Sequence, residues 1–209
     1  MDLSHPIASL TSPATARVLE VLAGTTRPLA GREIGRIAEE PDASVWRALG
    51  RLVKAGLVVR DERPVATYYV ANRDHLAWPA IESLVRLRSH LVEHIRNEIA
   101  SWPIQPLHAS LYGSFARGDA GPESDIDILL VRTRELDEDV WEAQVAEVRD
   151  HIFSWTGNRA QAFVVDPTRL VDHVGADDPL VKAWLHDGVL LVGHPLRQLL
   201  PQARARTGA

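Results

Sequence analysis

The sequence predicts a mixed α+β protein in which a long helix joins two parts. Residues 1–73 show the pattern of short helices followed by a β-hairpin. Residues 74–101 carry one helical apolar stripe, and residues 104–195 alternate strands with helices. We expect the last part to be an α/β domain with a small mixed sheet flanked by helices.

The composition is that of a folded protein without disulfides or membrane spans. Of the 209 residues, 45% are hydrophobic, 24% are charged and none is cysteine, which excludes disulfides and thiolate metal sites. No apolar run reaches the ~18 residues of a membrane helix. The first residues lack the basic start and apolar core of a secretory signal. We therefore expect a cytoplasmic protein with no membrane contact.

The formal net charge of −5 is unevenly distributed along the chain. Residues 1–75 contain 10 Lys/Arg and 9 Asp/Glu, a balance of +1, whereas residues 76–209 contain 13 and 19, a balance of −6. A DNA-binding domain is usually more basic than this N-terminal part. The acidic C-terminal part suits carboxylates that bind a metal, and it would repel a bare phosphate backbone.

The N-terminal part is expected to contain helices over 13–23, 30–38 and 43–55 and strands over 57–60 and 67–70. Proline at the first helical position and glycine just past the end delimit the first helix. The strands are rich in β-forming residues. Three helices followed by a hairpin, with a tight turn before the third helix, form the winged helix-turn-helix plan.

The third helix would be the helix that recognises DNA. Its outward positions, and one position in the hairpin, supply the candidate DNA-binding residues Ser44, Arg47, Arg51, Lys54 and Arg63. Arginines four positions apart share a helix face and can contact guanine or phosphate. The alternatives are a solvated helix face or a protein-interaction module.

One segment of this part carries a family resemblance. The runs Ser44-Val45-Trp46-Arg47 and Leu52-Val53-Lys54-Ala55-Gly56-Leu57-Val58 resemble those of MarR- and ArsR-type regulators. The resemblance implies that double-stranded DNA is a partner.

The linking element is predicted over 74–103, with one helix over 74–101 that ends before Pro103. Its apolar stripe can form the seam of a homodimer, as in readers of two DNA half-sites, or pack on the protein's own two domains. We expect domains over 1–73 and 104–195, on either side of this element, and a tail over 196–209. Its last part, 201–209, is short, basic and terminal, and is expected to be disordered.

The C-terminal part is expected to alternate its elements along the chain. Strands are predicted over 108–112, 126–131, 160–165 and 189–192, and helices over 138–154, 167–173 and 178–187. A glycine turn at Gly113-Ser114 follows the first of these strands and begins another helix.

Two aspartates follow that turn at a fixed distance. Ten residues separate Ser114 from Asp125, and Asp127 lies two positions further on. Residues i and i+2 of a strand point to one face, so the two carboxylates would lie side by side. Carboxylates this close disfavour joint ionisation unless a cation lies between them. We therefore expect Asp125 and Asp127 to bind Mg²⁺, the alternative being that they cap a helix or turn.

The residues around the turn form the predicted nucleotide-binding set, which is Gly113, Ser114, Arg117 and Ser124. Gly113 lets the backbone approach a phosphate closely, and Ser114 adds a hydroxyl and an amide at a helix start, where anions bind. Arg117 can pair with a triphosphate or bridge to Asp119 or Glu123.

The spacing Gly-Ser-x10-Asp-x-Asp is similar to the signature of the DNA polymerase beta-type nucleotidyltransferase superfamily, and it arises by chance in under roughly one per cent of such chains. The resemblance implies that Mg²⁺ and a nucleoside triphosphate, with ATP expected, bind at Asp125 and Asp127. It also implies transfer of a nucleoside monophosphate to a hydroxyl of a protein, an RNA or a small molecule. Small members act as antitoxins that modify a partner toxin, so a toxin or another protein is a candidate acceptor.

A third acid completes the site in active members of the superfamily and lies on a later strand. The corresponding position in the predicted strand 160–165 falls near Gln161 or Phe163, and neither is acidic. Asp166 is the nearest acid and precedes a proline, so it is a candidate catalytic residue or a helix cap.

Three functional hypotheses follow. The chain is a nucleotidyltransferase, or a transcription regulator whose second domain binds a nucleotide without transfer, or an adaptor that uses both domains for protein contacts. A missing third acid favours the second hypothesis. The intact Gly-Ser and Asp-x-Asp pairs favour the first over the third.

Overall fold

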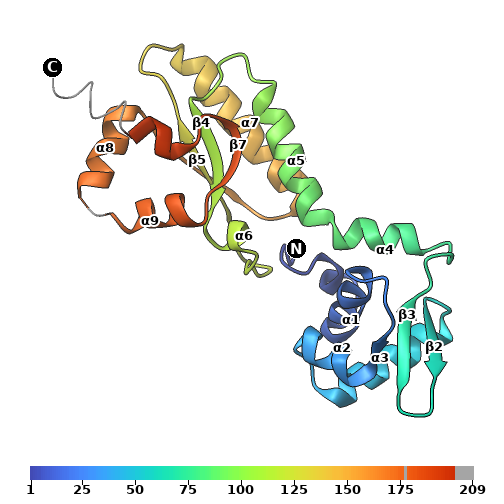
Figure 1. The fold of residues 1–209 in the computed structure, drawn as a ribbon. Coiled ribbons are helices and arrows are strands. Elements are labelled where there is room, and N and C mark those ends of the chain that lie inside the picture. The colour runs from blue at the N-terminus through green and yellow to red at the C-terminus, as the bar shows by residue number, and fades with distance from the viewer. Residues whose placement is uncertain (177, 201–209) are drawn as a thin grey trace. The chain divides into compact units, whose positions relative to one another are not determined.

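The computed structural model describes residues 1–176 and 178–200, and residue contacts divide the chain into two units (Figure 1). The main segment of one unit is Ser4–Arg88, and the other holds the chain from Ser89 onward. The disorder expected for 201–209 falls outside the described residues. Within the described part, no helix is both long enough and apolar enough to cross a membrane.

The first unit has the predicted order of three helices and a hairpin. Up to the end of the hairpin its elements are η1 (Pro6–Ser9), α1 (Pro13–Ala23), β1 (Leu29–Ala30), α2 (Gly31–Ala38), α3 (Asp42–Lys54), β2 (Val58–Glu62) and β3 (Thr67–Ala71). The strands form an antiparallel sheet in the order β1-β3-β2. Strand β1, which was not predicted, extends the hairpin to the winged form of a helix-turn-helix.

The close approach of α2 to α3 depends on a glycine at the start of α2. A Cβ atom on Gly31 would lie 2.2 Å from a ring carbon of Trp46 in α3, so any side chain there would displace the indole. The turn between the two helices passes through Glu39, whose φ of 55° is left-handed. The helix-turn-helix is therefore fixed by local geometry as well as by its buried apolar residues.

The predicted single helix over 74–101 is wrong in one respect, because the structure has two helices there. They are α4 (Trp78–Val85) and α5 (Leu87–Ala100), with Arg86 between them. Trp78 of α4 is buried in the core of the first unit, whereas Leu91, Ile95 and Ile99 of α5 are buried in the core of the second. The apolar stripe thus packs on the chain's own two cores, which was the alternative to a dimer seam.

The second unit contains a four-stranded sheet in the order β6-β5-β4-β7. Only β5 and β6 are parallel; the β4–β5 and β4–β7 pairs are antiparallel. After α5 its elements are β4 (His108–Tyr112), α6 (Gly113–Arg117), β5 (Ile126–Val131), α7 (Glu138–Thr156), β6 (Ala160–Val165), α8 (Pro167–Gly175), α9 (Pro179–His186) and β7 (Val189–Gly193). These bounds lie within about two residues of the predicted ones.

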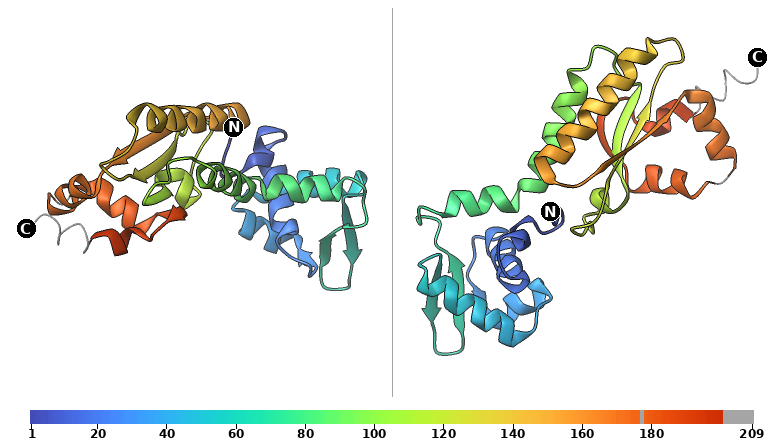
Figure 2. Two further views of the ribbon diagram at one scale, coloured as in Figure 1. Left: turned by 90° about the horizontal axis from the view of Figure 1, so that it is seen from above. Right: turned by 180° about the vertical axis from the view of Figure 1, so that it is seen from behind.

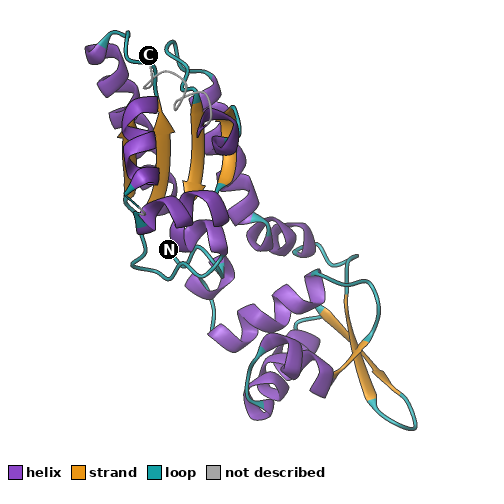
Figure 3. Cartoon of the chain, turned by 60° about the vertical axis from the view of Figure 1, so that its left-hand side comes forward, coloured by secondary structure: helices purple, strands orange, loops and turns teal. Residues whose placement is uncertain are grey.

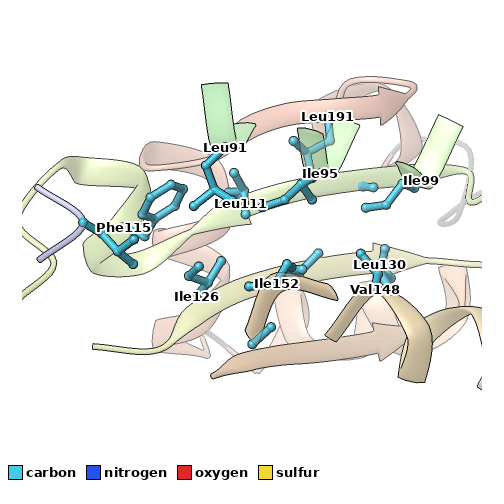
Figure 4. Close-up of a cluster of buried hydrophobic side chains, with 14 of the residues drawn as sticks. Leu91, Ile95, Ile99, Leu111, Phe115, Ile126, Leu130, Val148, Ile152 and Leu191 are labelled. Carbon is cyan, nitrogen blue, oxygen red and sulfur yellow. The ribbon is translucent and has the colours of Figure 1, made fainter. Parts of the chain in front are cut away.

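Helices cover both faces of this sheet (Figures 2 and 3). On one face α5 and α7 pack on β4 and β5. Figure 4 shows Ile95 of α5 near Leu111 and Leu191, and Ile152 of α7 near Leu130. Residues of α8 and α9 form a second core on the other face. Leu196 and Leu199 belong to that core, so the fold continues past residue 195.

The central strand β4 is buried along its whole length and contains a histidine. The Nδ1 atom of His108 lies 2.8 Å from the carbonyl oxygen of His194, and its Nε2 lies 2.8 Å from Ser110 Oγ. A carbonyl only accepts, so Nδ1 carries the proton and Nε2 accepts from the hydroxyl. Burial lowers the pKa of His108, and the bond to His194 opposes this only in part.

We expect this histidine to make the protein less stable in mild acid. The unfolded chain takes up a proton near pH 6.5 that folded His108 does not, so the free energy of unfolding falls below that pH, by at most about 1.4 kcal/mol per pH unit. Urea unfolding of wild type and His108→Gln between about pH 5 and pH 8 measures the difference in slope. Equal slopes for the two proteins would contradict the prediction.

Candidate functional site

The two predicted carboxylates lie where β5 begins. Asp125 directly precedes the strand and Asp127 is its second residue, and both are half-buried. In the sheet Asp127 pairs with Tyr112 of β4 on one side and with Gln161 of β6 on the other. The structure thus brings the end of β4, the start of β5 and the start of β6 together at one end of the sheet.

The glycine turn lies directly against the second carboxylate. Gly113 has a φ of +72°, and a Cβ atom there would lie 2.6 Å from Asp127 Oδ2. Only glycine combines this conformation with this approach. The first amides of a helix have no preceding turn to bond, so those of Gly113 and Ser114 are available beside the carboxylate.

The loop before Asp125 is held by a residue that the sequence analysis missed. Asn158 is buried, and its Nδ2 donates to the carbonyl oxygens of Pro122 (3.1 Å) and Ser124 (3.0 Å). The Ser124 hydroxyl accepts from the Gly121 amide at 2.9 Å. Ser124, which was predicted to bind nucleotide, therefore helps to shape the turn that presents Asp125. A lone asparagine after a helix gives no sequence signal of such a role.

The electrostatics of the pair favour a bound cation. Burial raises the pKa of Asp127, the charge of Asp125 raises it further, and Arg117 lowers it. Burial and then the Asp127 charge raise the pKa of Tyr112. A cation between the carboxylates would relieve their repulsion.

The donor set fits Mg²⁺ because both side chains offer hard oxygen atoms. The described residues contain no cluster of three or more His, Cys, Asp or Glu able to hold a metal. Mg²⁺ commonly binds one or two carboxylates and completes its shell with water and substrate phosphate. Asp125 and Asp127 are therefore the residues that would hold it.

Arg117 is fixed beside the turn by two acidic side chains. Its Nε lies 3.1 Å from Asp119 Oδ2, and an η-nitrogen lies 2.7 Å from Asp187 Oδ2, just after α9. The bridge to Asp119 was one of the predicted alternatives, whereas Asp187 was not foreseen because it is 70 residues away in sequence. The guanidinium lies at the turn in a defined position.

Asp166, the candidate third acid, lies at the other end of β6. It follows Val165, which pairs with Val131 at the far end of β5, and it lies five positions after Gln161, roughly 16 Å along an extended strand. Its side chain accepts from the amides of Thr168 (2.7 Å) and Arg169 (3.1 Å) and caps α8. The structure therefore separates Asp166 from the two carboxylates and supports the helix-cap interpretation.

The position beside the carboxylates belongs to Gln161. It pairs in register with Asp127, and its Nε2 donates to Asp125 Oδ2. Of the two strand positions considered for a third acid, Gln161 is the one beside the carboxylates, and its side chain is an uncharged amide.

In the first unit, the predicted DNA-binding residues of α3 differ in their contacts. Arg47 is exposed and folds back along its own helix, donating to Ala43 O (3.1 Å) and Ser44 Oγ (3.2 Å). Arg51 is exposed but donates to Thr15 Oγ1 at 2.7 Å, and so ties α3 to the start of α1. Arg47 is therefore exposed beside the half-buried Ser44, with bonds only within α3, whereas Arg51 also has a bond that joins two helices.

The remaining two residues lie at the end of α3 and in the wing. Lys54 is exposed in the last turn of α3. Arg63 donates to Asp61 at 2.8 Å and lies over the Tyr68 ring, 4.7 Å from its centre. Pairing with its own acid reduces the charge that Arg63 can offer to a phosphate.

Family models match both parts of the chain. A nucleotidyltransferase domain model matches residues 92–163, and an IclR helix-turn-helix domain model matches residues 15–62. The first match contains the Gly113 turn, both carboxylates and Gln161, and it ends before Asp166. No curated protein gives a significant match.

Structural comparison matches parts of this chain to several solved structures. NadR in complex with 4-hydroxyphenylacetate is 23% identical, with 44% of this chain and 69% of that chain covered and a TM-score of 0.36. A toxin-antitoxin complex with AMP-PNP is 19% identical over 56% of this chain and 86% of that one, with a TM-score of 0.38. The archaeal chromatin protein TrmBL2 is 12% identical over 92% and 90%, with a TM-score of 0.28.

Proposed function

We propose that this chain, which combines an IclR-type helix-turn-helix domain with a DNA polymerase beta-like nucleotidyltransferase domain, is a Mg²⁺-dependent nucleotidyltransferase that also binds double-stranded DNA. The observation that carries the proposal is the contact between the Gly113 turn and the Asp127 carboxylate at the start of β5. A phosphate-binding turn and a metal-binding pair are of use together when both engage one nucleoside triphosphate.

Each residue of the site would have a separate role in binding the nucleotide. The amides of Gly113 and Ser114 bind phosphate oxygens, and Arg117 adds positive charge at the side of the turn. Asp125 and Asp127 would hold Mg²⁺, which neutralises charge that develops on the phosphates. Gln161 orients Asp125 through its hydrogen bond. Transfer then moves a nucleoside monophosphate to an acceptor hydroxyl, with ATP the expected donor.

Label transfer from radioactive nucleoside triphosphates tests the activity. We expect transfer to a protein acceptor in the presence of Mg²⁺ and a loss of at least about 100-fold in Asp125→Asn/Asp127→Asn. The double variant keeps the size of both side chains, so its unfolding midpoint serves as the folding control. Nucleotide binding without transfer to any acceptor would reject the enzyme.

One observation favours a second candidate function. The Gln161 amide beside Asp125 cannot take a proton from an acceptor hydroxyl. A domain with two acids and an amide suits a transcription regulator that binds a nucleotide without turning it over. Calorimetric binding of Mg²⁺-ATP together with nucleotide-dependent DNA affinity, and no label transfer, would support this regulator.

For the DNA-binding activity we expect a salt-dependent interaction that involves α3. Removing a phosphate contact lowers the slope of log affinity against log salt by about 1, so Arg47→Ala and Lys54→Ala should each weaken binding in this way. Arg197→Ala, which changes an exposed arginine in the second unit, is the control. Fluorescence anisotropy on duplex DNA at several salt concentrations gives the slopes. Salt-insensitive binding, or no binding, would refute the prediction.

A further inference from the structure

The outer edge of β6 carries backbone groups that the sheet does not use. Strand β6 lies at the end of the order β6-β5-β4-β7. The carbonyls of Arg159 and Val165 accept from amides of the β5 segment, so the odd-numbered residues direct their backbone groups to β5. Because backbone groups alternate along a strand, those of Ala160, Ala162 and Val164 face outward.

One of these outward groups already has a partner, and the others are free among the described residues. Arg149 of α7 donates its Nε proton to the carbonyl oxygen of Ala160 at 3.2 Å. For Ala162 and Val164 the described part of the chain shows no partner on this side. An edge of this kind can pair with one more extended strand.

A groove runs along this edge between α7 and β6. It has two sections of about 660 and 700 Å³, which share Ala146 and Arg149 as lining residues. The second section ends at Asp125 and Gln161. A segment lying along the edge would therefore lead directly to the carboxylate site.

The lining of the groove suits a peptide better than a nucleic acid. Ala146, Ala162 and Val164 are small and leave space for side chains, and Phe153 of α7 is 56% exposed beside Asp125. The charged residues that line the groove are Arg132, Arg149, Arg159 and Arg169 and Asp125, Glu138, Glu142, Asp150 and Asp166, so the groove lacks the excess of positive charge that binds a phosphate backbone. Basic and acidic side chains are mixed along the groove, as at a polar peptide-binding edge.

We propose that the outer edge of β6 is the docking site for the acceptor, which is an extended segment of a protein that carries a hydroxyl side chain. The inference rests on the proposed transferase function and names its substrate class. The segment pairs with Ala162 and Val164 and places its hydroxyl beside Asp125. The hydroxyl oxygen then bonds to the α-phosphorus, the bond from that phosphorus to the bridging oxygen breaks, pyrophosphate leaves, and the hydroxyl proton passes to water.

Peptide binding without nucleotide tests the docking site separately from the chemistry. A library of random heptapeptides displayed on phage is selected against the full chain, and enriched peptides are synthesised with a fluorophore. We expect Ala162→Pro, which removes one outward amide, to weaken their binding at least tenfold, and Ala162→Ser, which keeps the amide, to bind like wild type. Proline is tolerated where an edge amide faces outward, and the unfolding midpoint reports on the fold.

A change in the peptide provides a second measurement that does not depend on a protein variant. The peptide is made in two forms that carry methyl groups on every second backbone nitrogen, one at the odd and one at the even positions. One of these forms lacks the amides that pair with β6, and we expect that form not to bind wild type. The absence of enriched peptides, or equal binding of wild type, Ala162→Pro and both methylated forms, would overturn the proposal. A dimer of the chain that Ala162→Pro dissociates would overturn it too, because a second copy would then occupy the edge.

The label-transfer assay separates failure of the inference from failure of the function. If peptides bind at β6 but receive no label, the docking site is supported and the transferase function is rejected. If wild type and Ala162→Pro transfer label to an acceptor at the same rate, the transferase function is supported and the docking site is rejected.

Discussion

Replacing Gly113 with alanine is expected to abolish nucleotide binding while leaving the protein folded. The new methyl group would lie 2.6 Å from Asp127 Oδ2, so either the carboxylate or the turn must move. A displacement of about 1 Å in a catalytic site lowers the reaction rate on the order of 100-fold. Here the residues that bind phosphate and those that bind the metal move relative to each other, so the nucleotide loses both sets of contacts. The left-handed φ of +72° adds about 1–2 kcal/mol of backbone strain to the folded state.

Two other glycines provide matched controls for this substitution. Gly157 has a φ of +74°, and a Cβ atom there would have no neighbouring atom within 4 Å, so Gly157→Ala carries the strain without the collision. Gly121 lies in the loop before Asp125, also in open space and without a positive φ. We expect calorimetry to show Mg²⁺-ATP binding to Gly157→Ala and Gly121→Ala but not to Gly113→Ala. Equal affinity in all three variants would show that the contact with Asp127 is unimportant.

Replacing Gln161 with glutamate is expected to raise the rate of transfer by on the order of 10²–10⁴, the usual contribution of a positioned acid or base. The substitution puts a third carboxylate in register with Asp127, where it can help bind Mg²⁺ and accept the proton of the acceptor hydroxyl. It also removes the hydrogen bond to Asp125. Without Mg²⁺ three carboxylates repel one another, so the unfolding midpoint should fall below that of wild type and recover when Mg²⁺ is added.

The control for this gain is Gln161→Met, which removes the hydrogen bond without adding charge. Single-turnover label transfer at saturating Mg²⁺ compares the two variants with wild type. We expect Gln161→Met to be no faster than wild type and to gain less stability from Mg²⁺ than Gln161→Glu does, because it has two carboxylates and not three. A rate for Gln161→Glu that does not exceed the wild-type rate would mean that the amide is not what restrains the chemistry.

Much of the carboxylate site could be predicted because it is encoded over a short distance. The turn at Gly113 and the spacing of Asp125 and Asp127 are local patterns, and the strand period alone puts both carboxylates on one face. Asn158 and Asp187 hold the loop and Arg117 from remote positions in the chain. Single polar residues carry no such information in a sequence, so these contacts appear only in the fold.

The errors in the predicted fold also arise from contacts between residues that are far apart in the sequence. No glycine or proline marks the break at Arg86; the apolar stripe continues across it, and the two halves belong to different cores. Strand β1 has two residues and exists because it pairs with β3 about forty positions later. The distance of Asp166 from the two carboxylates follows from strand register, which a sequence does not specify directly.

The parallel pairing of β5 with β6 has a consequence for how the site forms during folding. Gly113 and Asp127 come together through neighbouring antiparallel strands, whereas Gln161 reaches Asp125 from 36 residues away through a crossover that contains α7. Closing the longer loop costs more chain entropy, and contacts of greater sequence separation form more slowly. We expect the turn and the two aspartates to assemble first, with the amide that distinguishes this site arriving only when α7 has docked.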